Sequence, residues 1–266
     1  MKGLAKDPRS GPSPRLVRRP TWEPEKYRDI LVVVLTVTTG ATDAIGFLRL
    51  GGVFTSVMTA NMVLLGISAG RQDASLALHA GAAFAGFIVG AWLGARFVGG
   101  PTRRQPVWPR EITVALGVEL VLFAGFAAWW EVAAADPSSR VTYALIAINA
   151  VALGIQSGAV LRFGVPGLST TFLTGTLTQF VASLADRRES PSTRSLAILA
   201  ALVAGGALGA ALVTFVPRAA PAAPGGVLVL VLLGANVAFG RDGGAANGMR
   251  PVEGAHNNLE TGQVNG

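Results

Sequence analysis

Long apolar blocks, separated by short polar or glycine-rich stretches, run through most of this chain. Six of them approach or exceed the roughly 20 residues that a helix needs to cross the hydrocarbon core of a bilayer. These blocks are residues 29–50, 75–98, 112–132, 141–161, 194–216 and 225–240. The pattern predicts an all-α fold, a polytopic membrane helix bundle, with a transmembrane domain over residues 29–240.

Two shorter blocks, residues 55–69 and 169–184, are rich in Thr, Ser, Asn and Gln. Each follows a long apolar block and a glycine-rich break. They are candidates for short spans, re-entrant hairpins or halves of broken helices. Irregular backbone at membrane depth is tolerated only where it is buried in protein or lines a water-filled cavity. Broken helices of this kind often form the solute site of a transporter.

The arginines help to decide between these alternatives. If all eight blocks crossed the membrane from a cytoplasmic N-terminus, the cluster Arg96, Arg103, Arg104 and Arg110 would face outward, against the positive-inside rule. If the two short blocks dip in and return, that cluster lies in the cytoplasm. We therefore predict six full spans, two short broken or re-entrant helices, and both termini in the cytoplasm.

In this topology the first and fourth spans point in opposite directions, so the two halves, about 29–133 and 140–240, would form an inverted repeat. Small residues support the repeat because they recur at an offset of 115 positions. The second span has Gly86, Gly90 and Gly94, and the fifth has Ala201, Gly205 and Gly209. Small residues at this spacing allow another helix to approach closely.

Composition narrows the functional classes. Charged residues make up 14% of the chain, against about 25% in a typical soluble domain. There is no cysteine, and the two histidines are His79 and His256, so we expect no metal site and no cofactor. The net charge is +7, but eight of the 22 basic residues lie in residues 1–28. That distribution is typical of a cytoplasmic membrane flank, so we expect no nucleic-acid partner.

The tails at residues 1–28 and 241–266 are polar, with Pro, Arg and Ser in the first and Gly and Asn in the second. Neither has enough apolar surface to build a core. We therefore expect both tails to be disordered and cytoplasmic.

Two acidic residues inside predicted spans are candidates for function. Asp43 lies some 14 residues into the first span, about 20 Å along the helix. Glu119 lies eight residues into the third span. A carboxylate at membrane depth is costly, which makes each a candidate ion- or substrate-binding group. The structural alternative for Asp43 is that it caps the broken segment or pairs with Arg49.

Uncharged polar side chains near the two breaks form the rest of the candidate site. Hydroxyl and amide groups can replace the hydration shell of a solute. Alternatively, they satisfy backbone groups that the chain breaks leave free. Gln156 is more often a hydrogen-bond partner between helices than a ligand. The candidates are Thr55, Ser56, Thr59, Asn61, Gln156, Ser169, Thr170, Thr171 and Thr174.

The two broken segments carry a family resemblance. The stretches TTGATDAIGFLRLGGVFTSVMTANMVLLG and ALGIQSGAVLRFGVPGLSTTFLTGTLT resemble the YoaK-like family of bacterial integral membrane proteins, catalogued as a domain of unknown function. Members of that family commonly have Gly-Asn where this chain has Ala60-Asn61. The resemblance covers roughly residues 28–240. It implies a multi-span inner-membrane protein and no established substrate or reaction.

Our first functional hypothesis is a transporter or channel for a small solute or ion, with its site at the paired breaks. The alternative is a non-transporting scaffold or subunit of a membrane complex. An enzyme is not expected, because no pair of intramembrane aspartates and no serine–histidine arrangement is evident. The expected partners are the bilayer and a small solute or ion, and the sequence leaves a homo-oligomer open. The expected location is the bacterial inner membrane.

Overall fold

The computed structural model describes residues 23–99, 106–135, 139–165, 167–185 and 192–240. The described part is helical, and six of its helices are long and apolar enough to cross a membrane. The long helices are α1 Pro24–Arg49, α3 Ala74–Val98, α4 Arg110–Ala135, α5 Ser139–Leu161, α7 Thr193–Phe215 and α8 Ala222–Phe239. The predicted polytopic helix bundle is thus confirmed. Residues 1–22 and 241–266 of the predicted tails lie outside the described residues.

Helix is the expected conformation here because an apolar span must satisfy its backbone hydrogen bonds internally. The ends of the spans carry their own stop and start signals. The Asp73 side chain accepts a hydrogen bond from the Leu76 N–H at the start of α3, and Ser192 does the same for Ser195 at the start of α7. Gly99, with φ of +69°, ends α3 in a conformation that favours glycine.

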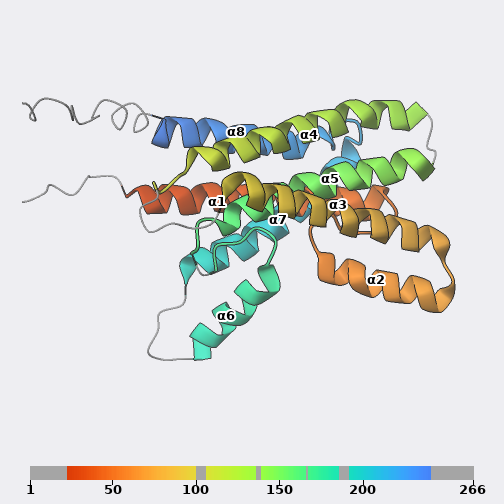
Figure 1. The fold of residues 1–266 in the computed structure, drawn as a ribbon, viewed down its shortest axis with the longest axis horizontal. Helices are drawn as coiled ribbons and strands as arrows, with labels where there is room; N and C mark the ends of the chain where they lie inside the picture. Colours follow the sequence, from red (N-terminus) through yellow and green to blue (C-terminus); the bar gives the residue numbers. More distant parts are fainter. Residues whose placement is uncertain (1–22, 100–105, 136–138, 166, 186–191, 241–266) are drawn as a thin grey trace, which may run out of the picture.

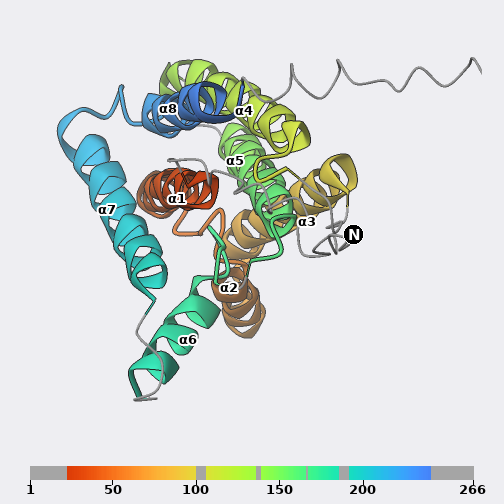
Figure 2. The same cartoon turned by 90° about the vertical axis from the view of Figure 1, so that its left-hand side faces the viewer.

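The two central helices are α1 and α5 (Figure 2). In their most apolar windows, 61% and 67% of residues are buried, against 22–33% for the other four spans. α7 packs along α1, and α3 packs along α5, while α4 and α8 contact each other and cover α5 and α1 respectively. The core is therefore built around the two helices that precede the breaks.

The two short helices are α2 Met58–Arg71 and α6 Leu173–Ala185. At 14 and 13 residues they extend only about 20 Å, which is less than the roughly 30 Å of a hydrocarbon core. α2 runs from the middle of the bundle toward the end where α1 finishes and α3 begins (Figure 1). α6 runs toward the opposite end, where α5 finishes and α7 begins. Each short helix returns to the end from which its segment entered.

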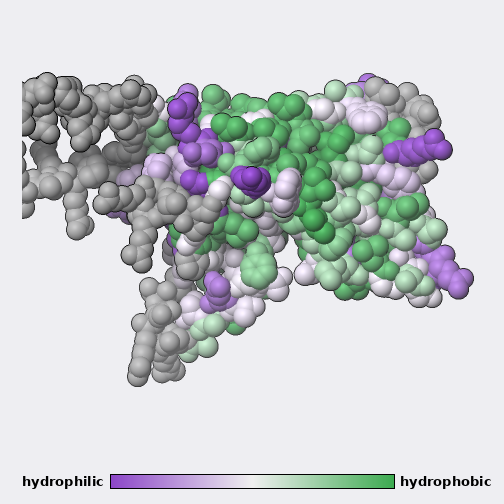
Figure 3. Space-filling model, in the orientation of Figure 1, coloured by the Kyte–Doolittle hydropathy of each residue, from purple (hydrophilic) through white to green (hydrophobic). Residues whose placement is uncertain are grey.

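The surface of the bundle has the character expected of a bilayer protein. Apolar side chains cover most of the visible face, and hydrophilic residues gather at the two ends (Figure 3). Large apolar side chains such as Phe215, Val203 and Val237 are more than 70% exposed. Such exposure is costly in water and favourable in contact with lipid. The exposed surface of the bundle is therefore suited to contact with the lipid bilayer.

An ionic cluster ties the first and second halves together at the end of the bundle where α1 begins. Arg28 donates to Oδ1 of Asp29 at 2.8 and 2.9 Å, and Arg194 at the start of α7 donates to Oδ2 at 3.1 Å. The Arg28 guanidinium also lies 5.7 Å from the Phe163 ring centroid. Asp29 was not among the predicted site residues, although it stands beside a basic residue at the end of a span.

Candidate functional site

Asp43 binds the first break in the chain, residues 50–57 between α1 and α2. The carboxylate is buried on α1 and faces the segment that leads into α2. Its Oδ1 accepts hydrogen bonds from the Thr55 N–H at 2.7 Å, the Thr55 hydroxyl at 3.0 Å and the Ser56 N–H at 2.8 Å. Its Oδ2 accepts from the Ser56 hydroxyl at 2.5 Å. Asp43 therefore satisfies two backbone donors that the break leaves without helical partners.

This geometry matches the capping alternative for Asp43 rather than the pairing with Arg49. The Arg49 guanidinium lies 6.0 Å from the Trp130 ring centroid, and no ion pair joins it to Asp43 in the described part of the chain. The backbone turns back after α1 through Gly51 and Gly52, with φ of +90° and +73°. These left-handed conformations favour glycine and bring residues 55 and 56 under Asp43.

Asn61, on α2, holds the backbone of the same break through Phe54. Its Oδ1 accepts from the Phe54 N–H at 3.1 Å, and its Nδ2 donates to the Phe54 carbonyl at 2.5 Å. Asn61 is fully buried, whereas Thr59, two residues earlier, is exposed. The polar side chains of the first break thus mainly fix the backbone, and Thr59 faces away from the core.

The second break uses uncharged groups. The hydroxyls of Ser157 on α5 and Thr171 form a hydrogen bond of 2.7 Å. The Ser169 hydroxyl accepts from the backbone N–H groups of Thr171 and Phe172 just before α6 begins. Thr170 is fully buried and its hydroxyl has no partner in the described part of the protein, while Thr174 is exposed.

Polar groups also lie between the central helices. The Gln156 Nε2 on α5 donates to the Thr39 hydroxyl on α1 at 2.9 Å, so Gln156 joins the two helices as the sequence indicated. Its Oε1 and the Thr38 hydroxyl are buried without partners among the described residues. Asn149 instead donates to the Leu145 carbonyl within its own helix. Thr38 and Thr39 were not among the predicted site residues, because threonines in an apolar span usually bond to their own helix.

Glu119 lies apart from both breaks. It is fully buried on α4, and neither carboxylate oxygen has a hydrogen-bond partner within the residues described. Its helical neighbours Leu116 and Phe123 belong to an apolar cluster that also contains residues of α1, α5 and α8. Of the two acidic candidates, Glu119 is thus the one whose carboxylate has no hydrogen-bond partner among the described residues.

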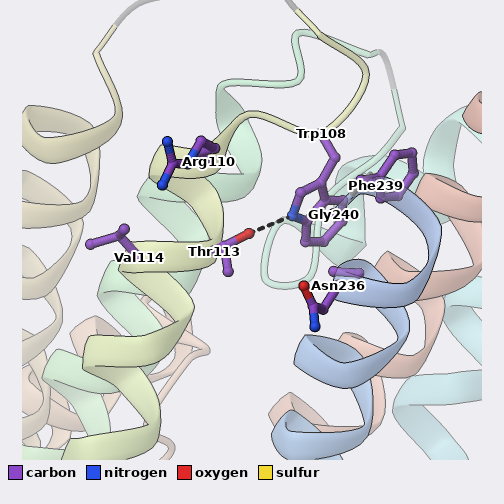
Figure 4. A pocket seen from close by; sticks show the side chains of 8 residues that line it. Trp108, Arg110, Thr113, Val114, Asn236, Phe239 and Gly240 are labelled. Atoms are coloured by element: carbon purple, nitrogen blue, oxygen red, sulfur yellow. Dashed lines mark hydrogen bonds between the residues drawn. The ribbon is translucent and has the colours of Figure 1, made fainter. Parts of the chain in front are cut away.

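Separate cavities adjoin the two breaks. The first, of about 360 Å³, lies between α1 and α7 and is lined by Asp43, Phe47, Phe54, Leu202 and Gly206, among others. The second, of about 310 Å³, is lined by residues near the second break, including Ser169 and Thr176. They share no lining residue, so neither of these two cavities joins the two polar segments. A third cavity, of about 480 Å³, opens between the start of α4 and the end of α8 (Figure 4).

Comparison with known proteins agrees with the fold. A family model described as "Protein of unknown function (DUF1275)" matches residues 31–234. The UPF0700 transmembrane protein YoaK of Bacillus subtilis (strain 168) is 35% identical over 161 residues, which are 60% of this chain and 69% of YoaK. No solved structure matches the chain. The resemblance drawn from the two broken segments is thus confirmed, and the chain belongs to the DUF1275 family of proteins of unknown function.

Proposed function

We propose that this protein is a transporter or channel for a small solute or ion in the bacterial cell membrane, and that it is not an enzyme. The observation that carries the proposal is the exchange of helices between its halves, α1–α4 and α5–α8. α1 packs against α7 of the other half, and α5 packs against α3. Each central helix is therefore held mainly by the half to which it does not belong.

Matched glycine contacts support an inverted repeat. A Cβ placed on Gly90 of α3 would collide with the Val151 carbonyl of α5, and one on Gly205 of α7 would collide with the Val37 carbonyl of α1. The two glycines are 115 positions apart and the two valines 114. The same close approach of backbones thus occurs at both exchanged interfaces.

The breaks follow the same correspondence. Asp43 accepts a hydrogen bond from the Ser56 hydroxyl, and Ser157, 114 positions after Asp43, bonds to Thr171, 115 positions after Ser56. In each half, a side chain of the central helix thus holds the segment before the short helix. Only the first half uses a carboxylate.

The solute site of this proposal is the cavity beside Asp43. In transporters with inverted repeats, solutes bind near the midplane where the repeats meet. This cavity lies between α1 of the first half and α7 of the second, and Asp43 is the only titratable residue in its lining. Its volume of about 360 Å³ suits a small solute. The apolar lining and the carboxylate favour a small cation or an amine.

We further propose that both termini are cytoplasmic. The first residues of α1 and the last residues of α8 lie at the same end of the bundle (Figure 1). Arg28, Arg110 and Arg194 stand at the helix starts of that end, and more arginines follow α3 in the sequence. An excess of basic residues is typical of the cytoplasmic side.

The test is flux into vesicles of phosphatidylethanolamine and phosphatidylglycerol that contain the purified full-length chain. The probes are labelled Na⁺, Rb⁺, Cl⁻ and choline, with an internal pH dye for H⁺. Asp43→Asn is the informative variant, because its Oδ1 can still accept from Thr55 and Ser56 while the charge is removed. We expect transport to fall to the level of empty vesicles. Full transport by the variant would remove the Asp43 charge from the mechanism, and no flux of any probe would count against transport itself.

The scaffold alternative loses its main support in this structure. In a scaffold, the ridges of small residues on α3 and α7 would be available to helices of other proteins. Gly86, Gly90 and Gly94 of α3 already pack against α5, and Gly205 and Gly209 of α7 pack against α1. These ridges hold the two halves of one chain together. Co-purification of a stoichiometric partner would nevertheless favour the scaffold.

A further inference from the structure

Glu119 is the feature that the proposed solute site does not use. Its carboxylate is 0% exposed, and neither oxygen has a hydrogen-bond partner in the described part of the chain. The apolar cluster around this part of α4 includes Leu116 and Phe123 of the same helix, Leu153 of α5 and Leu228 of α8. A buried acid in such surroundings needs a positive partner or a proton, because an isolated charge in an apolar interior costs many kcal/mol.

Charged side chains on the surrounding helices do not supply that partner. α4 packs against α3, α5 and α8, and α8 has no titratable residue. No described ion pair includes Glu119. Along α4, Arg110 is about 13 Å away and Glu131 about 18 Å. The titratable groups on these four helices are His79 and Arg96 of α3, Arg110, Glu111 and Glu131 of α4, and Arg140 and Tyr143 of α5.

His79 and Tyr143 are engaged with each other rather than with Glu119. The two ring centroids are 4.7 Å apart in an edge contact, and His79 Nδ1 lies 2.6 Å from the Ser75 carbonyl oxygen. A metal ion is a poor partner for Glu119 as well. Ca²⁺ takes six to eight oxygen ligands, and no group of three or more His, Cys, Asp or Glu side chains is placed to hold a metal ion among the described residues. The partner that fits a lone carboxyl in an apolar cluster is therefore a proton.

A cavity lies near the start of the same helix. The cavity of about 480 Å³ between α4 and α8 is lined by Trp108, Arg110, Thr113 and Val114 on one side and by Asn236 and Phe239 on the other (Figure 4). Trp108 donates to the Thr113 hydroxyl at 2.9 Å. Thr113 and Val114, which line this cavity, precede Glu119 by six and five residues and so lie about 8–9 Å from it along the helix axis.

We propose that Glu119 is a proton-binding site, loaded through the cavity between α4 and α8, and that it couples solute transport to H⁺. The coupling rests on the transport function proposed above, whereas the proton site does not. With α4 packed as in this structure, the carboxyl holds its proton. Movement of α4 relative to α5 and α8 would admit water to Glu119 and release the proton.

The first experiment detects the proton directly and requires no transport. Infrared spectra of the full-length protein in lipid nanodiscs are recorded with ordinary glutamate and with glutamate labelled at the side-chain carboxyl with ¹³C. A carboxylic C=O band that shifts with the label identifies a protonated glutamate. We expect this band in the wild type and in Glu131→Gln, which removes an exposed acid from the same helix. We expect it to be absent from Glu119→Gln.

Two outcomes overturn the proton site. One is the absence of a label-sensitive carboxylic acid band from the wild type. This result would not depend on whether any variant folds. The other is an unchanged band in Glu119→Gln. Glu119→Asp keeps the carboxyl if the amide variant does not fold, and its band should lose sensitivity to the glutamate label.

The second experiment follows H⁺ movement in the phosphatidylethanolamine–phosphatidylglycerol vesicles with the internal pH dye. Wild type and Glu131→Gln should move H⁺ with the transported probe, and Glu119→Gln should lose the H⁺ signal. Equal H⁺ flux in wild type and Glu119→Gln would overturn the coupling. A glutamic acid band without flux of any probe would overturn the transport function and leave the proton site standing.

Discussion

At the scale of single residues, the four hydrogen bonds of Asp43 make a prediction about stability that is separate from transport. Replacing Asp43 with Leu keeps the branched shape of the side chain but leaves the buried N–H groups of Thr55 and Ser56 without acceptors. Each buried N–H group left without an acceptor costs about 1–3 kcal/mol, so we expect the free energy of unfolding to fall by several kcal/mol. Asp43→Asn retains an acceptor and should lose much less. The measurement is the fraction of monodisperse protein that remains after heating in detergent.

Ser157→Ala is the matched control at the second break. It removes one hydroxyl–hydroxyl bond with Thr171 and no backbone acceptor. We expect a loss of about 1 kcal/mol or less. Equal heat stability of Asp43→Leu and Ser157→Ala would show that the carboxylate does not hold the first break.

The sequence was enough to predict that Asp43 and Glu119 lie deep in spans, because the positions of the spans follow from hydropathy alone. Which atoms meet Asp43 depends on the left-handed turn at Gly51 and Gly52, which aims residues 55 and 56 at it. A turn of that kind is set by several dihedral angles together, so the sequence offered capping only as an alternative.

At the scale of helices, neighbouring glycines of α7 should respond in opposite ways to the same change. A Cβ on Gly205 would collide with the backbone carbonyl of Val37, whereas one on Gly206 would meet only the Gly40 carbonyl at 3.9 Å. We expect Gly205→Ala to cost about 1–3 kcal/mol through forced separation of α1 and α7. Gly206→Ala should be neutral or stabilising by up to about 1 kcal/mol, because alanine is the better helix former.

The same contrast should occur in the other half. Gly90→Ala should destabilise because its Cβ would strike the Val151 carbonyl, whereas Gly81→Ala on the same helix meets nothing within 4 Å. Thermal unfolding of all four variants in one detergent gives the comparison. If Gly90→Ala and Gly205→Ala were as stable as their controls, close helix contact would not hold the halves together.

Helix positions were largely predictable, and helix partners were not. The long apolar blocks gave the six spans to within a few residues, apart from α1, which begins five residues earlier than its block. The glycine spacing of α3 indicated a flat surface. The spacing does not indicate whether α5 of the same chain or a helix of another protein packs on that surface. Partner choice follows from shape complementarity across the whole bundle, which no local pattern records.

At the scale of the whole molecule, the six-span arrangement brings together features that the sequence showed separately. Two central helices end in breaks, and each break is followed by a short helix that leads back to the end its segment came from (Figure 1). The polar segments therefore enter the bundle from opposite ends. This geometry agrees with the two separate cavities, one beside each break.

The arrangement can be tested on this cysteine-free chain with single cysteines and a membrane-impermeant maleimide. Arg49 and Gln72 flank the first break and α2, and both are exposed. If α2 re-enters, cysteines at both positions react from the same side of the membrane. If α2 crosses, they react from opposite sides. With cytoplasmic termini, we expect both to react on intact spheroplasts.

Leu161 and Thr193 provide the reciprocal pair around α6, since both are exposed and lie at the other end of the bundle. Cysteines there should react only after the membrane is permeabilised. Permeabilised membranes also serve as the control that every cysteine is reactive. Arg49 and Gln72 reacting from different sides would contradict re-entry. In a third outcome, Leu161 and Thr193 react on intact spheroplasts and Arg49 and Gln72 react only after permeabilisation. Each pair would then still share one side, so re-entry would stand and the proposed cytoplasmic orientation of the termini would be wrong.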